Sequence, residues 1–380
     1  MNRPFAGLKL SGASRFSVAG RSPLTGNWGD SSCGGYFAPE LRYAGFDGIV
    51  LTGKAESPVL LIIEDDAIRL ESAAAYRGKG IGDVNRSLKD RFGKSWRTLV
   101  IGPAGENQIR YAAILNEAHH AFGRAGFGAV MGAKNLKAIV VKAFSKTMQI
   151  SDPDTFEPLR QELNTKIREA LASDVLHVNG TAANLEGGVY SGDVPIKNFT
   201  SNFWQEMGEA LTGSVLTETC LTHASAYCGI ACKRNVEIKE GPFAIPDGPG
   251  PEYETIVSLG SLIGSMDLAA CCKTGRLRND LGLDTITTGA TIAWAMEAFE
   301  KADLTLADTD GIELLWGDMA TVIDRVIPAI VSRSGNLGQL LSLGSAAAAA
   351  SIGKGSDYTA HSKGLEIPAH DPEGVDMVWP

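Results

Sequence analysis

A glycine-rich segment near the start of the chain has the residue types of an anion-binding site. Residues 11–35 read SGASRFSVAGRSPLTGNWGDSSCGG and combine several glycines and hydroxyl side chains with Arg15 and Arg21. Small residues let backbone N–H groups approach an anion, and a guanidinium supplies the forked pair of donors that matches a phosphate group. The segment therefore predicts phosphate binding, with a plain hairpin of solvated arginines as the alternative.

A second segment of the same kind lies at residues 120–137 and reads HAFGRAGFGAVMGAKNLK. Its glycines surround Arg124, and Lys134 and Lys137 follow. The GRAGFG stretch has G-x-x-G-x-G spacing and precedes a predicted strand. The dinucleotide-binding fingerprint is instead G-x-G-x-x-G and opens a helix after a strand. The spacing therefore argues against a Rossmann fold.

The cysteines are a further candidate group for chemistry. Six of them are scattered over 380 residues, and Cys271 and Cys272 are adjacent. This spacing is not typical of a disulfide framework and fits metal or cluster ligation, or plain burial, better. Cys228 and Cys232 lie close together in YCGIACKRN. From the residues alone, the favoured interpretation of these two is a pair of buried thiols.

The elements that must position these residues change character near residue 150. Before it, short β-branched runs bounded by Gly, Pro or Asp predict strands, with helices between them. Ser151, Asp152 and Pro153 predict a helix start, and most periodic segments that follow are helical. The predicted strands span 15–19, 46–51, 59–63, 98–101 and 138–141, and the predicted helices span 82–92, 117–123, 154–172, 252–264, 266–282, 286–302, 308–314, 316–334 and 336–350. The fold class is therefore α+β, with a β-rich domain over residues 1–145 and an α-helical domain over residues 151–380.

Composition and charge exclude several function classes. With 44% hydrophobic residues the chain can bury a large core, so we expect a globular protein. The net charge of -9 provides no basic field for nucleic acid. The start of the chain lacks the apolar stretch of a signal peptide, and the aliphatic run at 59–63 is too short to cross a bilayer. We therefore expect a cytoplasmic protein with no nucleic-acid or membrane partner.

Several segments together resemble one known family. SRFSVAGRSPLTG, CGGYFAPELRYAGFDGIVLTGKAE, IGPAGE and GRAGFGAVMGAKNLKAI occur in this order and resemble the N-terminal domain of the aldehyde:ferredoxin oxidoreductase family. NGTAANLEGGVYSGDVPIKNFTSNFW, PEYETIVSLGS and RNDLGLDTITTGATIAWAMEAFEKA resemble its helical core. The resemblance implies that the β-rich domain is the base for two pterin dithiolenes. These would bind tungsten, or molybdenum, through four sulfurs, with a magnesium ion bridging the pterin phosphates.

The resemblance also implies which residues contact the cofactor. Arg15 matches a pterin-contacting arginine, and Arg124 with Ala125 matches the second phosphate-side contact. Ser32 falls where some members use an Asn oxygen toward the magnesium, and its hydroxyl is still a possible hard-cation contact. Residues 279–284 match the D-x-x-G-L-D pterin motif, with Asn in place of the first Asp. The predicted cofactor-binding residues are Arg15, Ser32, Gly34, Gly35, Arg124, Ala125, Gly126, Asn279, Asp280, Gly282, Leu283 and Asp284.

Two acidic residues are the implied catalytic candidates. Glu252 or Glu254, in PEYET, matches the acidic residue that family members place near the metal. Of the two, we expect Glu254 to be the acid/base or metal-shell residue. Without the resemblance, either side chain is interpreted as a helix N-terminal carboxylate that the helix dipole favours.

The resemblance implies a four-iron four-sulfur cluster as well. The family binds it through CxxCxxxC and one distant cysteine, because four thiolates complete the iron coordination. Cys228 and Cys232 match the last two positions of that motif, and Ser225 stands at the first. Cys220 could substitute for the missing thiolate only if the loop rearranged. The cluster is therefore expected with an incomplete ligand set.

The implied reaction is oxidation of a small aldehyde to a carboxylic acid at the metal. Two electrons then pass singly through the cluster to ferredoxin or another acceptor. The family is longer at both ends, which leaves three explanations: an incomplete gene, a split enzyme completed by another chain, or a degenerate relative with another role. Unpaired strand edges predict dependence on a partner, either a complementing chain or a homodimer. A non-catalytic binding or assembly subunit is the alternative function, and a hydroxy acid or an aromatic acyl thioester is the alternative substrate.

Overall fold

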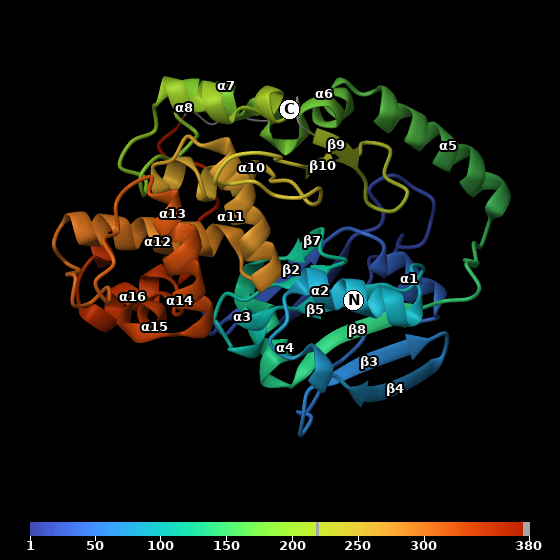
Figure 1. The fold of residues 1–380 in the computed structure, drawn as a ribbon. Helices are drawn as coiled ribbons and strands as arrows, with labels where there is room; N and C mark the ends of the chain where they lie inside the picture. Colours follow the sequence, from blue (N-terminus) through green and yellow to red (C-terminus); the bar gives the residue numbers. More distant parts are fainter. Residues whose placement is uncertain (218–219, 375–380) are drawn as a thin grey trace.

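The amino-terminal part of the chain is organised around a mixed sheet in the computed structural model, which describes residues 1–217 and 220–374. The strand order is β4-β3-β8-β5-β6-β7 (Figure 1). β3 and β8 are parallel, and the other neighbours are antiparallel. These strands are β3 (Val59–Glu64), β4 (Ala67–Ser72), β5 (Arg97–Ile101), β6 (Ile114–Asn116), β7 (His120–Phe122) and β8 (Leu136–Lys142).

Both faces of this sheet are covered, because its central strands are apolar at consecutive positions. Leu60 and Ile62 of β3 pack against α2 (Ile81–Phe92) on one face. Leu61 and Ile63 point to the other face, where α1, α4 and the hairpin of β1 and β2 lie. The elements on this second face are β1 (Phe16–Arg21), β2 (Trp28–Cys33), α1 (Phe37–Tyr43) and α4 (Phe127–Ala133).

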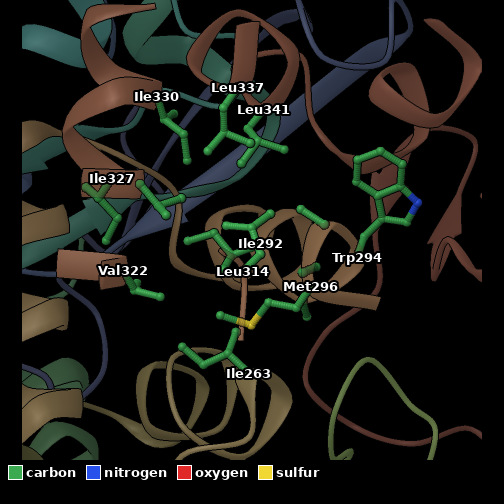
Figure 2. Close-up of a cluster of buried hydrophobic side chains, with 14 of the residues drawn as sticks. Ile263, Ile292, Trp294, Met296, Leu314, Val322, Ile327, Ile330, Leu337 and Leu341 are labelled. Carbon is green, nitrogen blue, oxygen red and sulfur yellow. The ribbon is translucent and has the colours of Figure 1, made fainter. Parts of the chain in front are cut away.

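The carboxyl-terminal part is mainly helical and surrounds α12 (Thr285–Glu300), which is buried along almost its whole length. A helix that is apolar on every side belongs in a core. Figure 2 shows Ile292, Trp294 and Met296 of α12 among the side chains that surround it. The other elements are α3 (Pro103–Glu106), α5 (Pro153–Glu169), α6 (Leu171–Asn179), α7 (Leu185–Ser191), α8 (Gln205–Leu211), α9 (Gly213–Thr217), β9 (Cys220–His223), β10 (Lys233–Val236), α10 (Tyr253–Ser258), α11 (Leu268–Leu281), α13 (Met319–Thr321), α14 (Ile327–Ser332), α15 (Gly335–Leu341), α16 (Ser345–Ile352), β11 (His361–Ser362) and β12 (Leu365–Glu366).

The α+β class is confirmed, since a sheet-containing region precedes a helical one. The predicted helix start is also confirmed, because Asp152 accepts a hydrogen bond from Thr155 N at 3.0 Å and Pro153 is the first helical residue. Within the described residues, no single helix has the length and apolar character to cross a membrane. One bent pair, Tyr253–Ile263 with Leu268–Leu281 at 115°, passes that test by length and composition only.

The predicted helix at 117–123 is wrong, because the chain forms a tight hairpin loop there. Glu117 and Ala118 have left-handed backbone, with φ of 53° and 64°. They join β6 to β7, in which Asn116 pairs with His120. Glu, Ala and His tolerate a helix, but pairing with the neighbouring strands decides the local structure here.

The predicted strand at 46–51 is also wrong. The carbonyl oxygens of Phe46 and Asp47 accept hydrogen bonds from Asn2, and residues 46–51 join no strand ladder in the described part of the chain. The side-chain pattern is typical of a strand, but within the described residues no strand lies next to this segment and pairs with it.

Two carboxyl-terminal helix predictions fail at glycines, and a third is confirmed with an irregular turn. Residues 308–311 form a turn, in which Gly311 has φ of 74°, and residues 312–314 have no regular secondary structure. The helix predicted at 316–334 is confirmed over residues 319–332, as α13, a π-helical turn (Val322–Val326) and α14, in which Pro328 supplies no N–H. The helix predicted at 336–350 breaks at Gly344, which has φ of 88°.

Candidate functional site

We call the sheet-containing part of the chain, up to the end of β8 at Lys142, the sheet domain, and the part from α5 onward the helical domain. The two enclose a cavity of about 370 Å³. The sheet domain contributes the end of β2 and the β6–β7 hairpin, and the helical domain contributes the β9–β10 loop and the ends of α10, α11 and α12. A concave site between domains, lined by a few polar groups, is a usual place for a ligand. The predicted site residues that line it are Arg15, Ser32, Gly34, Cys228, Cys232, Glu252, Glu254 and Asn279.

Two arginines reach the cavity, one from each domain. Arg15 belongs to the sheet domain and directly precedes β1. Its Nη2 donates a hydrogen bond to the backbone oxygen of Ser32 at 3.1 Å. Arg278, in the last turn of α11, is buried, and burial lowers the pKa of its guanidinium to about 10. Its Nε has no hydrogen-bond partner among the described residues. Because an unpaired buried N–H costs free energy, an acceptor on a ligand would stabilise this arrangement. Arg278 is not among the predicted site residues, although it directly precedes the 279–284 motif.

The two acidic candidates differ in their surroundings. Glu252 accepts a hydrogen bond from Lys233, whose charge holds the pKa of Glu252 below its usual range. Glu254 lies in the first turn of α10 and accepts from Ala369 N at 3.1 Å. Burial raises the pKa of Glu254. Glu252 is thus an ionised partner of Lys233, and Glu254 is the better suited of the two to take up or release a proton.

Three histidines that are not among the predicted site residues line the same cavity. The His119 ring stacks on the His223 ring at 4.6 Å, and the His120 ring lies 6.1 Å from His223. Burial lowers the pKa of His119 to about 4 and that of His120 to about 2. These imidazoles are therefore neutral near pH 7, and His120 Nε2 has no hydrogen-bond partner in the described chain. The sequence feature that could have indicated this histidine cluster is the adjacent pair His119 and His120 at the start of the second glycine-rich segment.

The lowered pKa of His119 predicts a loss of stability in acid. Between pH 6.5, the ordinary histidine value, and about 4, the unfolded side chain takes up a proton that the folded one does not. The free energy of unfolding therefore falls as the pH decreases through this window. Since one pKa unit corresponds to about 1.4 kcal/mol, we expect roughly 3 kcal/mol to depend on this group.

Urea unfolding across this pH range measures the effect. His119→Phe keeps a ring against His223 but cannot be protonated, so its stability should depend less on pH than that of the wild type. His361→Phe, at an exposed position in β11, is the control and should retain the wild-type profile. Identical pH profiles for the wild type and His119→Phe would contradict the prediction.

Arg124 and Asp284 form a second polar group at the domain interface. Arg124 Nη1 lies 3.7 Å from Asp284 Oδ2, and Arg124 Nη2 donates to the backbone oxygen of Glu366. Arg124 lies close enough to Glu254, and Arg15 to Glu252, for their charges to act on these carboxyl groups. The two arginines therefore flank the same acidic pair, as a shared ligand requires. Their contact with a cofactor stays a prediction.

Most residues of the 279–284 motif build the domain interface. Asn279 lines the cavity. Asp280 Oδ1 accepts from Gly82 N at 2.8 Å and so caps α2 of the sheet domain. Gly282 ends α11 in a left-handed conformation, Leu283 is fully buried, and Asp284 caps α12 by accepting from Ile286 N at 3.2 Å. The motif therefore fixes how α11 and α12 meet the sheet domain, with Asn279 closest to the cavity.

The predicted glycine contacts are explained largely by protein packing. A Cβ on Gly35 would lie 2.3 Å from Asn116 Nδ2, and one on Gly34 would lie 2.6 Å from Ser225 Oγ. Gly126 has φ of 76°, and a Cβ there would lie 2.0 Å from the backbone oxygen of Arg110. Ala125 also has left-handed backbone, with φ of 67°. These residues let the polypeptide approach itself closely around the cavity.

The structure brings together two of the three predicted cluster cysteines. Cys228 and Cys232 line the cavity, together with Cys33, a buried thiol whose pKa burial raises. Ser225 Oγ, at the first position of the motif, accepts from Gly35 N at 3.2 Å. Cys220 instead pairs with Val236 at the far end of the β9–β10 ladder from Cys232. Within residues 1–217 and 220–374, no three His, Cys, Asp or Glu side chains are placed to hold one metal ion.

A sheet-containing part and a helical part that converge on a cavity lined by arginine, histidine and carboxylate define an α+β protein with a candidate ligand site between the two parts. The particular family follows from comparison with known sequences. The family model described as aldehyde ferredoxin oxidoreductase, N-terminal domain, matches residues 1–143, and the model for domains 2 and 3 matches residues 158–379. The chain belongs to the aldehyde ferredoxin oxidoreductase family.

Several relatives and one solved structure are similar over nearly the whole chain. Tungsten-containing aldehyde ferredoxin oxidoreductases of Pyrococcus furiosus and Thermococcus kodakarensis are 37% and 36% identical over 98% of this chain, which spans 61% of their length. An aliphatic sulfonate oxidoreductase WOR-like subunit of Pyrococcus furiosus is 30% identical over 93% of this chain and 59% of its own length. The active site complex BamBC of benzoyl coenzyme A reductase, in complex with 1,5 dienoyl-CoA, has a TM-score of 0.83 and 25% identity, covering 96% of this chain and 56% of that one.

Proposed function

We propose that the chain is a tungsten-dependent oxidoreductase subunit that holds a bis-pterin cofactor and oxidises a small aldehyde to a carboxylic acid. Ferredoxin is the proposed electron acceptor. The observation that supports this best is the pair of buried polar atoms without partners, Arg278 Nε and His120 Nε2, beside one cavity. Relatives that match both domains are named as tungsten-containing enzymes. This match does not favour the non-catalytic assembly subunit.

The side chains around the cavity fit a ligand that bears phosphate groups. Arg15 and Arg278 line the cavity, and Arg124 lies beside Asp284 at the domain interface. Their guanidinium groups supply donors that match phosphate oxygens. Arg124 Nη1 makes no hydrogen bond within the described residues and therefore retains a donor for a ligand. We assign the magnesium contact to Ser32, whose hydroxyl oxygen accepts from Arg3 Nη2 at 3.3 Å and lies 2.7 Å from Ser17 Oγ. When Ser32 donates to Ser17, its oxygen keeps one lone pair for a cation.

The residues of this chain supply binding and proton transfer. When bound, the tungstopterin supplies the two-electron redox centre. Oxidation of an aldehyde takes one oxygen atom from water and releases two electrons and two protons, so a proton acceptor is needed. Glu254 takes that role, because burial raises its pKa. The neutral imidazoles of His119 and His120 can donate hydrogen bonds to a substrate carbonyl oxygen.

The proposed iron-sulfur cluster does not fit this chain by itself. A four-iron four-sulfur cluster needs four thiolates. Among the described residues the cavity is lined by Cys33, Cys228 and Cys232, and burial keeps the first of these as a neutral thiol. Cys228 and Cys232 remain the candidate ligands, and we assign no step of the reaction to the cluster.

Metal analysis combined with an activity assay tests the proposal. The chain would be produced in a host that makes tungstopterin and is supplied with tungstate, and tungsten, molybdenum and iron would be measured per folded chain. We expect tungsten close to one per chain and aldehyde-dependent reduction of an electron-accepting dye. Folded protein with no bound metal would overturn the enzyme assignment and support an assembly subunit.

A further inference from the structure

The carboxyl group of Glu366, in β12, is buried against two helices of the helical domain. The residue is 1% exposed. Its Oε1 accepts hydrogen bonds from the backbone N and from Oγ of Ser345, at the start of α16, both at 2.9 Å. Its Oε2 lies 2.9 Å from the hydroxyl oxygen of Thr287 in α12. Both carboxyl oxygens are therefore held by specific contacts.

Thr287 lies within hydrogen-bond distance of two carboxyl groups at once. Its Oγ1 is 2.9 Å from Glu366 Oε2 and 2.7 Å from Asp284 Oδ2. A hydroxyl group has one hydrogen atom and can donate to only one of these oxygens. The other contact needs a proton on a carboxyl oxygen, which then donates to the Thr287 oxygen. One of the two carboxyl groups must therefore be protonated in this arrangement.

The surroundings of the two groups decide which one carries the proton. Asp284 accepts from Ile286 N at the start of α12 and lies 3.7 Å from Arg124 Nη1, so a positive charge faces this carboxyl group. Arg124 reaches Glu366 only at its backbone oxygen. The hydrogen bonds that Glu366 accepts from Ser345 come from neutral groups, and the buried Tyr111 lies near both carboxyl groups. Burial, accordingly, raises the pKa of Glu366.

We propose that Glu366 carries the proton of a hydrogen-bonded chain, Glu366 to Thr287 to Asp284, and is a positioning residue for the Arg124–Asp284 pair. The protonated carboxyl donates to Thr287, and Thr287 donates to Asp284. Asp284 therefore stays ionised and holds Arg124 at the domain interface, while the Glu366 backbone oxygen fixes the other end of the guanidinium. The link to cofactor binding rests on the proposed function, whereas the position of the proton does not.

Glu366→Gln tests the position of the proton, because a glutamine amide copies a protonated carboxyl group. Its N–H can donate to Thr287, and its oxygen can accept from Ser345. A raised carboxyl pKa contributes stability below the unfolded value of about 4.3, and this contribution is lost as the pH rises toward the folded value. We therefore expect Glu366→Gln to match the wild type in unfolding temperature near pH 4, below the unfolded pKa, and to exceed it as the pH is raised to neutral. A variant that is destabilised at every pH would overturn the proposal.

Infrared spectroscopy gives a readout that a merely structural role would not change. The wild type near pH 7 should show the carbonyl band of a buried protonated carboxyl group, shifted in heavy water, and Glu366→Gln should lack it. Thr287→Val, which removes the shared hydroxyl but keeps the shape, should shift that band, whereas Thr287→Ser should retain it. A wild-type spectrum indistinguishable from that of Glu366→Gln would overturn the proposal even if the chain contained tungsten. A metal-free chain that shows the band would refute the proposed function alone.

Discussion

Replacing Gly289 with alanine should lower the free energy of unfolding by about 3 kcal/mol or more, although alanine is the better helix former. Gly289 lies where α12 passes α10, and a Cβ there would be 2.2 Å from the backbone oxygen of Ser258. A backbone oxygen cannot rotate aside, so the two helices would have to move apart in a closely packed core. Thermal unfolding followed by circular dichroism, with urea unfolding for the free energy, measures the loss.

The sign of this change separates packing from helix propensity. Propensity alone predicts that alanine in the middle of a helix stabilises by about 1 kcal/mol. Gly20→Ala, in β1, is the control for adding a methyl group without a clash. The nearest atom to its added Cβ, Phe127 Cε1, is 3.5 Å away, which is an ordinary contact. A Gly289→Ala protein as stable as the wild type would mean that α10 and α12 do not approach in this way. Since α10 carries Glu254 and α12 begins beside Asp284, their spacing also sets the width of the candidate site.

Helices and strands whose structure is decided by their own residues, and not by distant partners, were predicted correctly from the sequence. β3 and β8 are runs of aliphatic residues, the pattern that a strand buried on both faces requires, and both were predicted. The helix start at Asp152 was predicted because its cap and its proline act locally. The strand predicted at 46–51 and the helix predicted at 117–123 failed, because the hydrogen bonds there are decided by distant partners, such as Asn2.

The candidate site was predictable to the extent that its residues resemble family motifs. Arg15, Glu252 and Glu254 were identified in this way, and the structure brings them to one cavity. Arg278 and Glu366 were not identified, because ordinary charged residues acquire significance only when burial removes their solvent and their contacts become fixed. Glu366, for example, contacts a threonine 79 positions earlier in the chain, a relation that no local spacing reveals.

Arg124→Ala should reduce bound tungsten per folded chain by at least about tenfold. The guanidinium carries one nitrogen with no hydrogen bond, and hydrogen bonds to charged groups contribute about 1.5–3 kcal/mol each. Two such bonds to a phosphate group would therefore account for tenfold or more in affinity. Arg124→Lys keeps the charge but loses the forked geometry, so we expect intermediate loading. Plasma mass spectrometry of the monodisperse folded fraction measures the metal.

Stability must be separated from binding in this experiment, because removing Arg124 leaves the buried carboxyl group of Asp284, 2% exposed, without its cation. The double variant Arg124→Ala with Asp284→Asn removes that uncompensated charge. It should recover stability relative to Arg124→Ala while remaining metal-poor. Arg168→Ala, at an exposed position of α5, controls for the loss of a positive charge and should retain wild-type loading. If Arg124→Ala bound as much tungsten as a loaded wild type, Arg124 could not be a cofactor contact, and the ligand would have to be held by Arg15 and Arg278.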